Sequence, residues 1–158
     1  MRTSFIFVIQ DAMMLISMGL IARFYIYPRL EKLSIYKSLT ILSFFSVFRC
    51  LGLTYLVPGV ANALPASFTI PAAYGDFTTS LLSLVAIILL RRQHRAGIAV
   101  GWLMNIVGTL DLVCAYYLGL KLPWWEYATG AIWFFPIVLV PVLCMGHAMA
   151  FVLMVRKP

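Results

Sequence analysis

Long apolar runs separated by short polar gaps dominate the pattern of this chain. Each run is about 20 residues long, the length that an α-helix needs to cross the hydrocarbon core of a bilayer. The runs cover residues 4–27, 36–57, 71–90, 97–118 and 131–154. The gaps between them are too short to separate domains. The pattern therefore predicts an all-α fold, in which residues 1–158 form a single transmembrane domain of five helices.

The composition excludes a water-soluble domain. Of the 158 residues, 63% are hydrophobic and 11% are charged, whereas soluble domains have about 45–50% and about 25%. A soluble domain of about 150 residues buries only about 70% of the surface of its unfolded chain. It could not hide this much apolar surface from water, so we expect the lipid bilayer to cover the remainder.

The basic residues set the predicted orientation. The net charge is +7, and most Lys and Arg residues lie in the gap before the second run, in the gap before the fourth run and after the fifth. By the positive-inside rule, the N-terminus is predicted outside and the C-terminus in the cytoplasm, with Trp124 and Trp125 at the outer interface. The net positive charge therefore follows from the Lys and Arg residues of the predicted cytoplasmic gaps, and nucleic acid is not expected as a partner.

Four ionisable residues lie in a similar position within the predicted spans, although a charge at the centre of a membrane costs about 2.5–3.5 kcal/mol. They are Asp11, Arg49, Asp76 and Asp111. At about 1.5 Å per residue, each lies roughly 8–12 Å from the outer end of its helix. Four different helices thus bring one ionisable residue each to a common layer in the outer half of the bilayer.

Small and polar side chains continue from these positions along the same helices, which is typical of faces inside a bundle. The additional candidates for the layer are Gln10, Thr79, Ser80 and Asn105. Two interpretations stay open. In the first, Arg49 forks to one or two of the Asp side chains and fixes the helices. In the second, the surplus of carboxylates is balanced by a proton, water or a bound cation, and the layer is a binding site.

Residues 60–70 are too few for a span and too apolar for an ordinary exposed loop. We expect a re-entrant or interfacial cap there, with a plain extracytoplasmic loop as the alternative. Pro71 then suits the first turn of the third helix. Gly75, next to Asp76, permits the close approach of a neighbouring backbone or a ligand. Such a cap would open the layer toward the outside.

His147 is the remaining ionisable residue in a span, and we expect it outside the layer. Counted along the fifth helix it lies roughly 24 Å from the outer surface, where a hydrogen bond across helices would satisfy it. The nearby soft ligands do not share its face, so no metal and no cofactor are expected. The three cysteines, Cys50, Cys114 and Cys144, are expected as free thiols packed between helices.

Two short motifs resemble those of a known group of proteins. Residues 71–76 read P-A-A-Y-G-D, and residues 105–112 read N-I-V-G-T-L-D-L. They resemble the P-A-x-x-G-D and N-x-x-G-x-x-D-L patterns of small uncharacterised bacterial multi-pass membrane proteins. The resemblance covers mainly the second to fourth spans. It implies a location in the bacterial cytoplasmic (inner) membrane and adds weight to Asp76 and Asp111, but it implies no activity.

The sequence lacks the motifs of common enzymes, such as G-x-S-x-G, H-E-x-x-H and the P-loop. The function we expect is therefore binding of a small molecule or a cation by the acidic layer, extending to proton-linked transport. The alternative is a non-catalytic accessory or scaffold subunit that docks other membrane proteins or a second copy of this chain. An intramembrane enzyme acting on a lipidic substrate is a third, less favoured reading.

Overall fold

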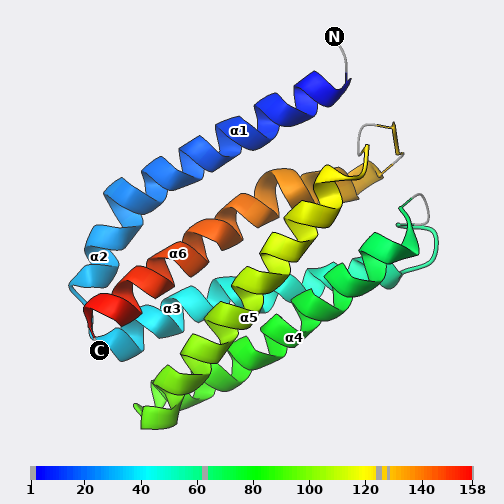
Figure 1. The fold of residues 1–158 in the computed structure, drawn as a ribbon. Helices are drawn as coiled ribbons and strands as arrows, with labels where there is room; N and C mark the ends of the chain where they lie inside the picture. The colour runs from blue at the N-terminus through cyan, green and yellow to red at the C-terminus, as the bar shows by residue number, and fades with distance from the viewer. Residues whose placement is uncertain (1–2, 62–63, 124–125, 128, 158) are drawn as a thin grey trace.

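The computed structural model describes residues 3–61, 64–123, 126–127 and 129–157, which form a bundle of long helices (Figure 1). Five helical stretches are long and apolar enough to cross a membrane: Thr3–Glu31, Ile35–Leu56, Ala66–Arg91, Arg95–Leu120 and Gly130–Arg156. Each predicted run corresponds to one of these stretches, which confirms the all-helical fold and, within the described residues, five helices long and apolar enough to span a membrane. Trp124 and Trp125 lie outside the described residues.

Three of the five stretches change their helical type along their length. The first consists of α1 (Thr3–Ile21), a π-helical segment (Ala22–Ile26) and α2 (Tyr27–Glu31). The second consists of α3 (Ile35–Val47) and the 3₁₀ segment η2 (Phe48–Leu56). The third and fourth are the continuous helices α4 (Ala66–Arg91) and α5 (Arg95–Leu120). The fifth consists of a 3₁₀ turn (Gly130–Trp133), the π-helical segment η5 (Phe135–Leu139) and α6 (Val140–Arg156).

The third span begins earlier than predicted. α4 starts at Ala66, so Pro71 lies inside the helix, and the prediction that Pro71 occupies the first turn is wrong. A proline here removes one backbone donor of the second turn, and α4 nevertheless continues through it to Arg91. The segment before α4 packs against the end of the bundle, where Ala61 and Leu64 are buried.

The second span differs more strongly from a simple α-helix. It continues after Val47 as a 3₁₀ segment of nine residues, although 3₁₀ runs longer than three or four residues are uncommon. The buried residues of η2 are Arg49, Gly52 and Tyr55, each three positions from the next. Because a 3₁₀-helix has 3.0 residues per turn, these three residues lie in one line along the segment.

The interior has an apolar cluster toward each end and a polar layer between them. One cluster lies among the ends of α2, α3, α4 and α6 and includes Leu30, Leu39, Leu90 and Leu153. The other lies at the opposite end and includes Tyr55, Phe68, Ala73 and Ile132. Buried polar residues between them are Ser43, Ser46, Arg49, Thr79, Ser80, Ser83, Asn105 and His147.

Helices α4 and α5 pack closely, whereas α1 lies at the edge of the bundle (Figure 1). A Cβ atom on Gly97 would lie 2.9 Å from the backbone nitrogen of Leu90, so this glycine permits the close approach of the two helices. All residues of Thr3–Ile21 are described, and none of them is buried. α1 packs on α6 and η5, so most of its surface remains for lipid.

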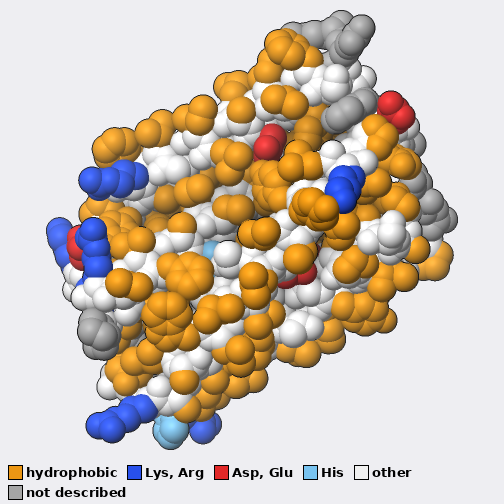
Figure 2. Space-filling model, in the orientation of Figure 1, with side chains coloured by type: hydrophobic (Ala, Val, Ile, Leu, Met, Phe, Trp, Pro, Cys, Tyr) orange, Lys and Arg blue, Asp and Glu red, His pale blue; other side chains and the backbone are white. Residues whose placement is uncertain are grey.

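Most of the basic side chains visible in Figure 2 gather at the end of the bundle that holds α2, the turn between α4 and α5, and the end of α6. Arg156 forms an ion pair with Glu31 at 3.5 Å, and the Lys157 ammonium donates to the Leu33 carbonyl at 2.9 Å. These contacts bring two of the basic clusters together at one end.

The three cysteines are free, but two of them do not pack between helices. Cys50 and Cys114 are exposed, and Cys144 is half-buried. The prediction of buried thiols is therefore wrong for Cys50 and Cys114, because both lie on outward faces of their helices.

Candidate functional site

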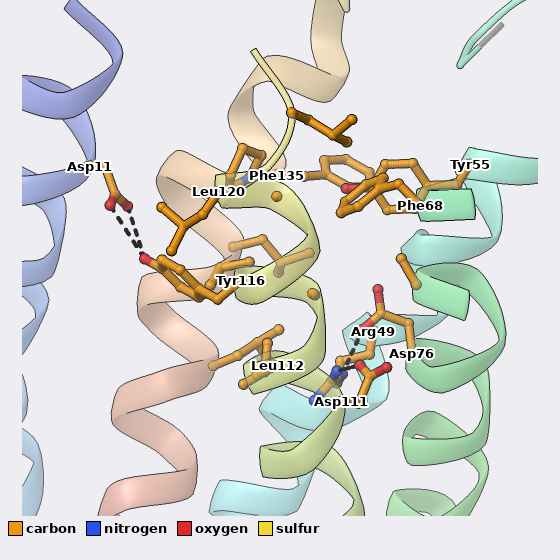
Figure 3. A pocket seen from close by; sticks show the side chains of 18 of the residues that line it. Asp11, Arg49, Tyr55, Phe68, Asp76, Asp111, Leu112, Tyr116, Leu120 and Phe135 are labelled. Carbon is orange, nitrogen blue, oxygen red and sulfur yellow. Dashed lines mark hydrogen bonds and ion pairs between the residues drawn. The ribbon is translucent and has the colours of Figure 1, made fainter. Parts of the chain in front are cut away.

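The centre of the site is the guanidinium group of Arg49, which is completely buried. Arg49 lies in the first turn of η2, and its side chain is 0% exposed. Its Nε donates to Asp76 Oδ1 at 2.7 Å, and its Nη2 forms an ion pair and hydrogen bond with Asp111 Oδ2. One arginine thus joins η2, α4 and α5 through two carboxylates (Figure 3).

The other side of the guanidinium contacts α5 and α6. Arg49 Nη1 donates to the Gly108 carbonyl at 2.9 Å and lies 3.3 Å from His147 Nε2. His147 Nδ1 lies 2.6 Å from Asn105 Oδ1, and the Asn105 amide donates to the His147 carbonyl at 3.3 Å. Because the Asn105 oxygen can only accept, we assign the imidazole proton to Nδ1, which leaves Nε2 to accept from Arg49.

The prediction that His147 lies outside the layer is wrong. A depth counted along an ideal straight helix misses this contact, because the distance between two side chains also depends on helix tilt and on the direction of each side chain around its helix. Gly108 also leaves room for the ring, because a Cβ atom there would lie 2.5 Å from His147 Cε1. The expected hydrogen bond of His147 across helices is present, and its partner is Asn105.

Two glycines provide the space in which the carboxylates sit. A Cβ atom on Gly52 would overlap the carboxylate of Asp76, and one on Gly75 would overlap the carboxylate of Asp111. Each acidic side chain therefore lies directly against the backbone of the neighbouring helix. The predicted close approach at Gly75 is present, and it is made by the side chain of Asp111 from α5.

A cavity of about 250 Å³ lies above this ion cluster. Arg49, Asp76 and Asp111 form its floor, and apolar residues of α1, α4, α5 and η5 form most of its walls (Figure 3). Opposite the floor, the Tyr55 ring makes edge-to-face contacts with Phe68 and Phe135, with ring centroids 5.6 Å and 5.5 Å apart. The site is therefore apolar along its length and charged at one end.

Asp11 lines the same cavity but does not join the ion cluster. It accepts a hydrogen bond from the Tyr116 hydroxyl, whose oxygen lies 3.3 Å and 3.4 Å from the two carboxylate oxygens. Among the described contacts, those of Arg49 do not include Asp11. The predicted layer of four ionisable residues thus divides into a cluster of three and a separate Asp11–Tyr116 pair across the cavity (Figure 3).

The polar candidates from the sequence have different positions. Asn105 supports the cluster through His147. Thr79 donates to the Gly75 carbonyl at 2.9 Å, and Ser80 donates to the Val47 carbonyl at 2.8 Å, so both satisfy backbone groups. Gln10 accepts from the indole of Trp133 at 3.0 Å. In the described part of the chain, these four residues are not among those that line the cavity.

Sequence reasoning missed Tyr55 and Tyr116 as residues of the site. Helical periodicity could have placed Tyr116 in the site, because positions 111, 112, 115 and 116 lie on one face of an α-helix. Tyr55 lies six residues after Arg49, which is two turns only if the segment is 3₁₀. An α-helical reading of the second span therefore could not place it in the site.

One family model matches the chain, and it covers residues 6–155, nearly the full length. The chain belongs to the family DUF8737, described as a domain of unknown function. The DUF8737 match includes all of the site residues described above. Comparison with curated proteins and with solved structures finds no match.

The charges of this DUF8737 site do not balance. With all groups ionised, one guanidinium faces two carboxylates, so the floor of the cavity has a net charge of −1, and Asp11 adds a further −1. No group of three or more His, Cys, Asp or Glu side chains suited to a metal is found in the described ranges. The arrangement presents acceptor oxygens to the cavity, and a positively charged or hydrogen-donating ligand would complement them.

Proposed function

We propose that this protein is a ligand-binding membrane protein whose cavity takes a small molecule or cation against the Asp76–Arg49–Asp111 floor. The observation that carries the proposal is the cavity itself, because a purely structural ion cluster needs no open space beside it. The side chains of Asp76 and Asp111 are 15% and 14% exposed, whereas that of Arg49 is 0% exposed. The carboxylates are thus accessible within an otherwise buried group.

We place the basic end of the bundle in the cytoplasm, following the positive-inside rule. The N-terminus is then outside, and the cavity lies in the outer half of the bilayer. The motif resemblance supports the bacterial inner membrane as its location. In this orientation a ligand would reach the cavity from the extracytoplasmic side or from the outer leaflet.

The surplus negative charge also suggests how binding could be coupled to protons. A cation and a proton would compete for the same carboxylates, because either one neutralises the floor. Exchange of one for the other would link ligand release to proton uptake, which is the basic requirement of proton-linked transport.

The proposal is tested by measuring whether the cavity is open to water. In a variant with the three native cysteines replaced by alanine, Ala115→Cys places a thiol in the cavity wall. Val113→Cys is the matched control, because Val113 lies on the same helix and is 60% exposed on an outward face. We expect membrane-impermeant charged methanethiosulfonates, added to right-side-out vesicles, to modify the thiol at 115 much faster than the one at 113.

Equal slow reaction at both positions would refute a water-accessible site and would favour an accessory subunit with a dry ion cluster. The orientation is tested separately with cysteines at two exposed positions at opposite ends of α5, Lys121→Cys and Arg95→Cys. We expect the first to react from outside the cell and the second only after permeabilisation, and the reverse result would refute the orientation.

A further inference from the structure

We infer that the ligand is an organic monocation, an ammonium group attached to a compact apolar body. This inference rests on the proposed function, because it specifies the ligand of the same cavity. Three features of the described residues carry it: the sign of the accessible charge, the shape and polarity of the walls, and the size of the space.

The accessible charge of the floor is negative when both carboxylates are ionised. The Arg49 side chain is 0% exposed, and its nitrogens already contact Asp76, Asp111, the Gly108 carbonyl and His147, so an anionic ligand would have to compete with these partners for the guanidinium. The partly exposed groups are the two carboxylates. A single positive charge would bring the floor from −1 to zero, whereas an anion would raise the imbalance in a poorly solvated space.

The walls favour an organic cation over a metal ion. Ca²⁺ requires about six to eight oxygen ligands and Mg²⁺ requires octahedral coordination with retained water, which the apolar walls do not provide. Above the floor, Leu112, Leu139 and Leu143 line the cavity together with the aromatic residues Tyr55, Phe68 and Phe135. An apolar body would fill this part of the cavity, and the aromatic rings can also contact a cation through their faces.

The volume limits the size of the ligand. At about 250 Å³, the cavity lies just below the roughly 300–1,000 Å³ that is typical of small-molecule pockets. A single aromatic ring with a short alkylammonium chain is a ligand small enough for such a space. Asp11 and Tyr116 lie across the cavity from the floor and offer a second polar contact to such a ligand.

Three probes of nearly equal size and different charge test the inference: phenethylamine, phenylethanol and phenylacetate. Each is added to the Ala115→Cys protein while the thiol is modified by a methanethiosulfonate. We expect phenethylamine to protect the thiol at a concentration about tenfold or more lower than the concentration of phenylethanol that gives equal protection. One charge-assisted contact to a carboxylate accounts for a difference of this size. We expect phenylacetate to protect least.

Two further measurements locate the effect at the floor. Relative to its rate with a free thiol in solution, the cationic trimethylammonioethyl reagent should modify the thiol at 115 faster than the anionic sulfonatoethyl reagent does, and this comparison needs no change to the floor. Asp111→Asn, which neutralises the floor while keeping its shape, should abolish the advantage of the amine over the alcohol. For the thiol at 113, neither the probes nor the charge of the reagent should change the modification rate, measured relative to a free thiol in solution.

The outcomes separate the inference from the function on which it rests. If the thiol at 115 does not react with either reagent, the water-accessible cavity and thus the proposed function are refuted. If it reacts, but phenethylamine protects no better than phenylethanol or phenylacetate, the cavity stands and the organic monocation is refuted. Faster reaction with the anionic reagent would refute it as well.

Discussion

Replacement of Arg49 by alanine is expected to be the most damaging single change in the protein. The side chain is fully buried and donates to Asp76, Asp111 and the Gly108 carbonyl. Its removal leaves two carboxylates in the interior without a counter-charge, whereas Asp11 keeps its own partner, Tyr116. Breaking a buried ion pair by removing one partner costs about 3–5 kcal/mol.

The expected loss of stability is large enough to measure as a melting temperature in detergent. For a chain of this length, 1 kcal/mol shifts the midpoint by about 2–4 °C, so Arg49→Ala should melt roughly 6–20 °C below the parent protein. Arg92→Ala is the matched control, because Arg92 is exposed in the turn between α4 and α5. Exposed positions of this kind usually change stability by no more than about 0.5 kcal/mol.

A triple variant tests whether charge imbalance, and not lost volume, causes the effect. Arg49→Met combined with Asp76→Asn and Asp111→Asn removes all three charges while keeping most of the side-chain volume. It should melt above Arg49→Ala, because replacing a whole buried ion cluster is much less destabilising than breaking it. The reasoning is refuted if Arg49→Ala melts within about 2 °C of the parent, a shift below 1 kcal/mol.

The remaining predictions concern single side chains around the cluster. Gly75→Ala should lower the melting temperature strongly, because its Cβ would overlap the Asp111 carboxylate. Gly146→Ala, with open space around the new Cβ, should be neutral or slightly stabilising. Equal effects of the two substitutions would refute the close contact between Gly75 and the Asp111 carboxylate. His147→Ala should cost about 1–3 kcal/mol in thermal unfolding because it leaves buried hydrogen-bonding partners unsatisfied, and parent-like melting would count against its place in the cluster. Asp11→Asn should change stability by less than about 1 kcal/mol, because an amide oxygen can still accept from the Tyr116 hydroxyl; a loss as large as that of Arg49→Ala would show that Asp11 belongs to the same ion cluster.

The arrangement of the spans could be predicted because it depends on length and hydrophobicity alone. A run of about 20 apolar residues has few alternatives to a membrane-spanning helix. The pairing of Arg49 with Asp76 and Asp111 could also be anticipated, because buried charges require partners and these three residues fall at similar depths. The sequence left open which carboxylate pairs with Arg49, and the structure shows that both do.

The positions of His147 and Asp11 could not be predicted from depth. Depth fixes one coordinate of a residue, whereas contact also depends on the direction of the side chain around its helix and on the tilt of that helix. Asp11 has a depth similar to that of Arg49 but lies on α1 at the edge of the bundle, across the cavity. The depth of His147 along its helix predicts no contact with Arg49, yet the ring reaches Arg49 because Gly108 leaves room for it.

The 3₁₀ segment explains why one short stretch of chain contributes a residue to the cavity floor, a glycine that accommodates a carboxylate, and a residue of the aromatic wall. In an α-helix, residues at i, i+3 and i+6 rotate about 60° away from one another at each step, so they would leave a common line. In η2 they stay aligned, and Arg49, Gly52 and Tyr55 all face inward. Arg49 then forms the floor, Gly52 accommodates Asp76, and Tyr55 stands in the aromatic wall. The poorer hydrogen-bond geometry of a long 3₁₀ run is therefore offset by contacts that an α-helix at this position could not make.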